Sequence, residues 1–122
     1  MLEVTHQCNL ACEGCGRIRE YKETMREMLS TEACIQSVDE CPAPVVTVTG
    51  GEPLMHPEID KIISAIVNKK RHVYLCTNGI LLTDAIKKLK PSKYFNINVH
   101  IDGLADTHNA IAGKGVFERA IH

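Results

Sequence analysis

The sequence has little that would direct the chain to nucleic acid, through a membrane or out of the cell. Its 14 basic and 15 acidic residues give a formal net charge of −1, so it lacks the strong positive charge of most nucleic-acid-binding proteins. No apolar stretch approaches the ~20 residues of a membrane-spanning helix. The first residues, MLEVTHQC, lack the basic region and hydrophobic run of a secretory signal peptide. We therefore expect a cytoplasmic protein with no nucleic-acid partner.

Basic residues are nevertheless concentrated in two segments of the chain. They are Lys69, Lys70, Arg71, Lys87, Lys88, Lys90 and Lys93. The simpler interpretation is that they lie at helix C-termini and form a solvated face, because cations are favourable near the negative end of a helix. The alternative is weak attraction to an anionic membrane surface, which would give the protein a peripheral membrane contact.

Strand and helix patterns alternate along the 122 residues, a length that suits one domain. Short apolar segments predict strands at residues 2–5, 45–49, 72–76 and 94–101. Helical spacing predicts helices at residues 30–41, from 56 onward, at 83–89 and from 115 onward. Alternation of this kind is typical of a parallel sheet with right-handed crossovers, so the expected class is α/β.

Unusual polar residues follow each of the four predicted strands. They are the cysteine loop HQCNLACEGCGR at residues 6–17, Gly50-Gly51-Glu52-Pro53, Cys76-Thr77-Asn78, and His100 with Asp102. Ligands of parallel sheets bind at the carboxyl ends of the strands. We therefore expect these four segments to converge on one site.

Three of the six cysteines, Cys8, Cys12 and Cys15, lie within one short loop. A structural zinc site needs four ligands, usually from two CxxC pairs, and this sequence has one such pair. A disulfide is disfavoured in a reducing compartment. Three thiolates with a vacant fourth position suit an iron–sulfur cluster, although a metal that only staples the loop stays an alternative. Cys34 and Cys41 share a predicted helix face, where we expect both to be small buried residues.

The segment CNLACEGC resembles the CxxxCxxC signature of the radical S-adenosylmethionine (SAM) superfamily. GGEP at 50–53 is similar to its second motif, and Thr77-Asn78-Gly79 and Asp102-Gly103 resemble the ends of its third and fourth strands. The resemblance covers the whole chain and implies the N-terminal part of a partial (β/α)6 TIM-like barrel. It also implies that residues 1–122 are an incomplete radical SAM core domain of about four βα units from a longer chain.

The resemblance implies two cofactors, a [4Fe–4S] cluster and SAM. Cys8, Cys12 and Cys15 would ligate three irons, and the fourth iron would take the amino and carboxylate groups of SAM. An electron, supplied by a reductant such as flavodoxin or ferredoxin, would break the S–C5′ bond and release a 5′-deoxyadenosyl radical.

Cofactor-binding roles follow from the same resemblance. Gly50 and Gly51 would let the backbone approach the ligand closely, and Glu52 would accept from the SAM ammonium group. Thr77 and Asn78 would bind the SAM ribose or carboxylate, unless they only form a turn.

The fourth strand end departs from the superfamily pattern. His100 stands where many members have a small hydroxyl residue, so it would bind the SAM carboxylate, orient substrate or pack inside the barrel. Asp102 is expected to fix the turn rather than to act as an acid.

A narrower resemblance is to the radical SAM enzyme of bacterial hopanoid synthesis. It is carried by the segments THQCNLACEGCGRI, CPAPVVTVTGGEPLMHPEI, HVYLCTNGILL, KPSKYFNINVHIDG and GVFERAI. The resemblance implies a transferase. Enzymes of that family add the 5′-deoxyadenosyl group to the alkene of diploptene, which is a hopene, and the product is adenosylhopane. The alternative is a radical SAM enzyme that acts on a peptide, an RNA or another small molecule.

Cys76 is a candidate catalytic residue under the hopanoid hypothesis. Because side chains alternate along a strand, the side chain of Cys76 points to the opposite face from that of Leu75. Cys76 also lies at the carboxyl end of its strand, where the site is expected. Radical addition to an alkene leaves a carbon radical on the product, and a thiol hydrogen is weakly enough bound to quench it. The alternative is that Cys76 is a small core residue.

Overall fold

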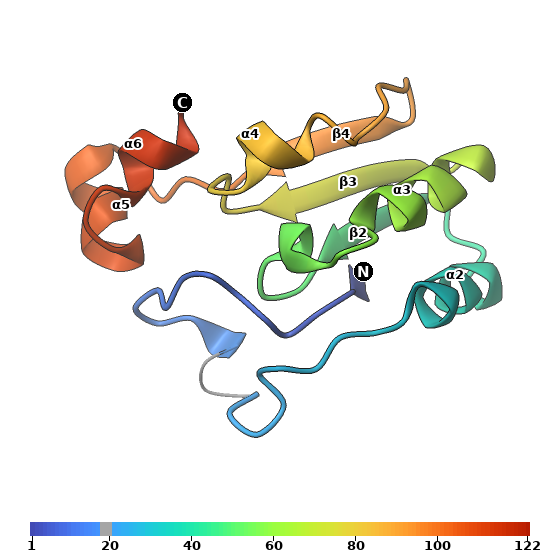
Figure 1. Ribbon diagram of the computed structural model, residues 1–122, viewed down its shortest axis with the longest axis horizontal. Coiled ribbons are helices and arrows are strands. Elements are labelled where there is room, and N and C mark those ends of the chain that lie inside the picture. The colour runs from blue at the N-terminus through green and yellow to red at the C-terminus, as the bar shows by residue number, and fades with distance from the viewer. Residues whose placement is uncertain (18–20) are drawn as a thin grey trace.

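The computed structural model describes residues 1–17 and 21–122, which form a four-stranded parallel sheet with helices (Figure 1). The strands are β1 (Leu2–Glu3), β2 (Val45–Thr49), β3 (His72–Thr77) and β4 (Phe95–Val99), and they lie in the order β1-β2-β3-β4. Each neighbouring pair is parallel. The predicted α/β class with a parallel sheet is confirmed.

Within residues 1–17 and 21–122, five α-helices and one 3₁₀ helix lie in the connections between strands and after β4. They are α2 (Thr31–Glu40), η1 (Pro53–Met55), α3 (Ile59–Asn68), α4 (Leu82–Ala85), α5 (Ala105–Ala112) and α6 (Val116–Ala120). Helix α3 packs against β3, and α2 packs beside α3. Figure 1 shows α5 and α6 together, at the end of the sheet to which the strand arrows point.

The core lies between the sheet and helices α2 and α3. Strand β3 alternates, with Val73 and Leu75 fully buried on the helix side and Tyr74 half-buried on the other side. Helix α3 buries four isoleucines against this face, namely Ile59, Ile62, Ile63 and Ile66. Each such side chain contributes roughly 1.5–3 kcal/mol when removed from water. This face of the sheet is therefore filled by apolar side chains.

Several predicted boundaries differ from the structure. The first strand pairs with β2 only at residues 2–3, and Thr5 instead forms an antiparallel bridge with Met28. Helix α4 ends at Ala85, and turns follow it where a longer helix was predicted. Helix α5 was not predicted. Three of its four apolar residues are consecutive and do not show helical spacing, and the helix packs on α6 rather than on the sheet.

The prediction that Cys34 and Cys41 are both buried is correct for one of the two residues. Cys34 is fully buried in the core. Cys41 is exposed, because α2 ends at Glu40 and Cys41 is the C-cap residue in an extended conformation. The prediction that Cys41 is buried is therefore wrong.

Several of the clustered basic residues have partners within the chain. Lys69 pairs with Asp39, and Lys87 pairs with Asp84. Arg71 donates to two backbone carbonyls at the end of α2. These contacts fit the interpretation as helix-end cations, and peripheral membrane contact stays a prediction. None of the described helices combines the length and apolar character needed to cross a membrane.

Candidate active site

The four predicted segments meet around one cavity of about 260 Å³ at the carboxyl ends of the strands. Its lining residues are Cys8, Leu10, Cys12, Cys15, Arg17, Thr49, Gly50, Gly51, Cys76, Thr77, Asn78 and His100. Of the predicted site residues, Glu52 and Asp102 lie outside this lining. Segments as far apart in the chain as the cysteine loop and the end of β4 thus form a single site.

Close backbone contact holds the cysteine loop against the Gly-Gly segment. Gly51 N donates to Thr5 O at 2.8 Å, and Glu52 N donates to Gln7 O at 2.7 Å. A Cβ atom at Gly51 would lie 2.2 Å from Gln7 O, and one at Gly50 would lie 2.2 Å from Thr5 O. Only glycine permits this approach at either position.

The three loop cysteines are half-buried and close enough to influence one another. The pKa of the Cys12 thiol is raised, chiefly by burial and then by Cys8 and Cys15. Arg17, which the sequence analysis did not single out, donates to His6 O at 3.4 Å and to Leu10 O at 3.1 Å. Arg17 therefore ties the two ends of the cysteine loop together.

Glu52 is fully buried behind the cavity. Its Oε1 accepts from Leu54 N at 3.0 Å and from Thr77 Oγ1 at 2.8 Å, and its Oε2 accepts from Asn78 N at 2.8 Å. Burial raises the pKa of this carboxyl, and the three hydrogen bonds oppose that rise. The carboxylate joins the ends of β2 and β3. Its contact with the SAM ammonium group stays a prediction.

Thr77 and Asn78 are held in place by similar contacts. The Thr77 hydroxyl donates to Glu52 and accepts from Gly79 N at 3.1 Å. Asn78 Oδ1 accepts from Ile80 N at 3.1 Å, which forms the predicted turn. Both residues therefore have structural partners, and their contacts with SAM stay predictions.

His100 belongs to a chain of three polar residues at the end of β4. Its Nε2 lies 2.9 Å from Asp102 Oδ1, and Asp102 Oδ2 lies 3.2 Å from Nδ1 of His108. The His100 side chain is 73% exposed, whereas that of His108 is 2% exposed. Asp102 thus orients His100 at the cavity and also closes the turn through its backbone N–H to His108.

His108 was not identified from the sequence. It is six residues from Asp102 on the unpredicted helix α5, and no motif marks it. Its Nε2 is buried without a hydrogen-bond partner among the described residues.

Cys76 lies on the cavity side of β3, as strand alternation predicted. It is half-buried and lines the same cavity as the three loop cysteines, whereas Leu75 is buried in the core. The cavity position is compatible with hydrogen-atom donation, which stays a prediction.

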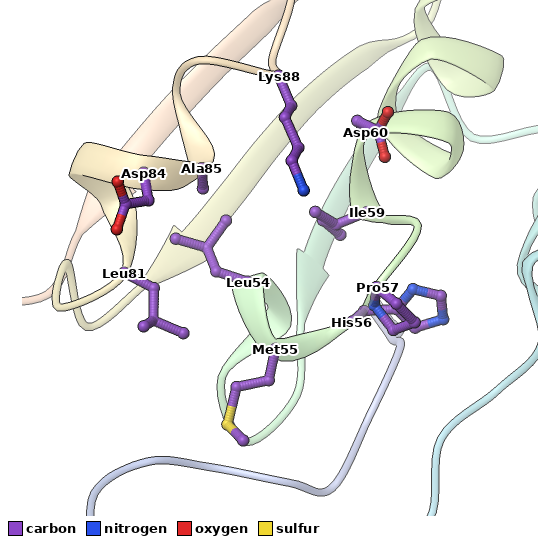
Figure 2. A pocket seen from close by; sticks show the side chains of 10 residues that line it. All are labelled: Leu54, Met55, His56, Pro57, Ile59, Asp60, Leu81, Asp84, Ala85 and Lys88. Atoms are coloured by element: carbon purple, nitrogen blue, oxygen red, sulfur yellow. The ribbon is translucent and has the colours of Figure 1, made fainter.

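A second cavity of about 240 Å³ lies on the helix side, between η1, α3 and α4 (Figure 2). Leu54, Ile59 and Leu81 give it an apolar wall, Asp60 lies on α3, and Lys88 extends toward it from the turn after α4 (Figure 2). None of the cysteines lines it. The three loop cysteines and Cys76 line the first cavity and not this one.

Residues 2–122 match the family model described as the Radical SAM superfamily. The chain belongs to this superfamily. The predicted fold, with the parallel strands of a radical SAM domain, is confirmed by this match together with the sheet topology.

Three curated relatives show similar levels of identity to this radical SAM chain. GTP 3′,8-cyclase of Aliarcobacter butzleri is 34% identical, and the match covers 98% of this chain and 39% of the relative. AdoMet-dependent heme synthase of Methanosarcina barkeri is 34% identical, with 98% and 36% covered. Mycofactocin maturase MftC of Mycolicibacterium smegmatis is 32% identical, with 98% and 31% covered. The chain thus spans less than half of each relative, and their names do not refer to hopanoids.

Two solved structures share the fold of this radical SAM chain. Streptococcus suis SuiB, bound to its precursor peptide SuiA, has a TM-score of 0.76 at 19% identity, over 89% of this chain and 25% of SuiB. TYW1 with a lysine-pyruvate adduct has a TM-score of 0.60 at 22% identity, over 94% of this chain and 46% of TYW1.

The cofactors of the Radical SAM superfamily are a [4Fe–4S] cluster and SAM. The residues of this chain fit them, because thiols are the usual ligands of such clusters and three line the cavity beside the glycine backbone. Within residues 1–17 and 21–122, no group of three His, Cys, Asp or Glu side chains is arranged to hold a single metal ion. In a cluster each cysteine binds a different iron, so the thiols need not converge on one point.

Proposed function

We propose that this chain forms the cofactor-binding core of an enzyme that cleaves SAM reductively to methionine and a 5′-deoxyadenosyl radical. The observation that carries the proposal is the convergence of Cys8, Cys12 and Cys15 with Gly50 and Gly51 on one cavity. The bound cluster would supply the electron for the cleavage, after receiving it from a flavodoxin or a ferredoxin.

The residues of the chain have separate tasks in this proposal. The three loop cysteines would hold the cluster, and Arg17 keeps their loop closed through its contacts with His6 O and Leu10 O. Gly50 and Gly51 bring two backbone segments together without side chains between them. His100, oriented by Asp102, presents its imidazole to the cavity, where it binds the SAM carboxylate or orients substrate.

Two substrate classes are supported by different observations. The names of the relatives, which refer to GTP, heme and mycofactocin, favour a small molecule or a peptide. The hopanoid-like sequence segments favour addition of the adenosyl group to diploptene, which would make the protein a transferase. The position of Cys76 in the cavity suits the second class, because addition to an alkene requires a hydrogen donor at the end.

Anaerobic reconstitution of the complete gene product with iron and sulfide tests the proposed SAM cleavage. We expect about four irons per chain, the number in one cluster, and 5′-deoxyadenosine release under a strong reductant. Replacing Cys8, Cys12 or Cys15 by alanine should abolish both. The exposed Cys41 gives a matched control, and Cys41→Ala should retain both.

Stoichiometric zinc with no SAM cleavage would instead support the metal-stapled module. If SAM is cleaved, incubation with diploptene distinguishes the substrate classes. Adenosylhopane among the products supports the hopanoid hypothesis. Release of 5′-deoxyadenosine without that product would contradict it and favour a peptide or another small molecule.

A further inference from the structure

The side chain of Asn78 connects the end of β3 to the cysteine loop. Its Nδ2 donates to Asn9 Oδ1 at 2.8 Å and lies 3.9 Å from the sulfur of Cys8. Cys8 and Asn78 are 70 residues apart in the chain. This contact joins a residue of the strand end directly to a thiol that the proposed function assigns to the cluster.

The orientation of the Asn78 amide is determined by its other partners. Ile80 N–H donates to Oδ1, so the nitrogen must face the opposite way, toward Cys8 and Asn9. The backbone N–H of Asn78 is held by the buried carboxylate of Glu52. A fully buried carboxylate with three donors is a rigid support, so the amide is positioned before any cofactor binds.

Two N–H groups approach the Cys8 sulfur. Leu10 N lies at 3.5 Å and Asn78 Nδ2 at 3.9 Å, both within hydrogen-bonding range for sulfur. Hydrogen bonds to the sulfur ligands are one of the properties that set the reduction potential of a cluster. A donor stabilises the negative charge that increases when the cluster accepts an electron.

We propose that Asn78 is a positioning residue whose amide raises the reduction potential of the cluster by donating a hydrogen bond to the Cys8 thiolate. This inference rests on the proposed cluster-binding function. It differs from a turn role, because the turn needs only the Oδ1 atom and an aspartate would satisfy it equally well. The Nδ2 contact with Cys8 is what the proposal adds.

The test compares Asn78→Asp and Asn78→Ala with the wild type in an EPR-monitored redox titration of the reconstituted gene product without SAM. Asn78→Asp keeps the turn acceptor, removes the donor and adds a negative charge beside the sulfur. We expect its ratio of reduced to oxidised cluster at a fixed potential to fall by about tenfold, which is about 59 mV for a one-electron couple. Asn78→Ala should shift the midpoint in the same direction by less.

Two further variants separate the sulfur contact from other effects. Asn68→Ala, at an exposed position at the end of α3, is the matched control and should leave the midpoint unchanged. Asn9→Ala removes the partner of the amide but keeps the donor to Cys8, so it should shift the midpoint less than Asn78→Ala. An equal or larger shift in Asn9→Ala would overturn the proposal, because the effect would then come from the loop position.

Failure of this inference is distinguishable from failure of the proposed function. A wild-type protein that assembles the cluster and cleaves SAM, with unchanged midpoints in both Asn78 variants, would refute the inference alone. A wild-type protein that assembles no cluster would refute the function and the inference together. Lower midpoints in the order wild type, Asn78→Ala, Asn78→Asp would support the inference.

Discussion

Replacing Gly51 by alanine should disrupt the contact on which the whole site depends. The added Cβ would lie 2.2 Å from Gln7 O, 2.6 Å from Gln7 C and 2.7 Å from His6 O. All three atoms belong to the backbone, so no side-chain rotation can relieve the overlap. The cysteine loop must therefore move away from the Gly-Gly segment.

The loss of folding stability can be estimated from the contacts that this movement breaks. Overpacking of a close contact costs about 1–3 kcal/mol. Displacement of the loop also strains or breaks two backbone hydrogen bonds, Gly51 N to Thr5 O and Glu52 N to Gln7 O, each worth about 0.5–1.5 kcal/mol. The sum is a loss of about 2–6 kcal/mol from a total stability of about 5–15 kcal/mol.

Gly115→Ala is the matched control. Gly115 has a positive φ of 76° and open space around its Cβ position, so alanine there is strained but meets no neighbour. The expected cost is about 1–2 kcal/mol for a left-handed backbone. Since Gly115 lies outside the cavity lining, cluster binding should persist.

Urea unfolding of the protein without cluster would measure both costs, and iron and sulfide analysis after reconstitution would measure cluster content. We expect Gly51→Ala to lose stability and most of its cluster, and Gly115→Ala to lose only stability. A free energy of unfolding of Gly51→Ala within about 0.5 kcal/mol of the wild type is the range of a neutral surface substitution. That result, together with a full cluster, would contradict the predicted role of the Gly51 contact.

Two further predictions concern the buried carboxyl and the cavity thiol. The pKa of Glu52 is raised above the 4.5 of an unperturbed carboxyl. Between pH 4.5 and the pKa of Glu52 in the folded state, the folded state therefore binds more protons than the unfolded state. The free energy of unfolding of the wild type, relative to Glu52→Gln, should therefore be highest below pH 4.5 and fall as the pH rises through the folded pKa. Urea unfolding of both proteins across this window checks the sign, and a rising difference would contradict it. Cys76→Ala should still cleave SAM but should slow formation of the saturated adenosylated product from diploptene, measured by mass spectrometry. An unchanged rate of that product would remove Cys76 from the role of hydrogen donor.

The amino-acid sequence alone was enough to predict the class of fold and most of the polar residues that line the cavity. Strand alternation is local, and parallel strands bring their carboxyl ends to the same edge, so segments following different strands had to meet. Helix α3 was recognisable because its isoleucines recur at helical spacing against the sheet. The three cysteines were recognisable because their spacing alone restricts the metal groups that they can hold.

Contacts between separate elements, which the sequence did not reveal, determine which polar atoms are available to a ligand. Glu52 was predicted as an acceptor for the SAM ammonium group, and the structure shows in addition that it is buried and accepts from donors at the end of β3, 25 and 26 residues away. Likewise, His108 contacts Asp102 from helix α5, which packs on α6. No local sequence pattern predicts that packing. The physical reason is that hydrogen-bond partners between separate elements depend on how those elements pack. Local periodicity specifies the helices and strands, whereas the contacts between them depend on how the sheet, the cysteine loop and the helices pack in the folded chain.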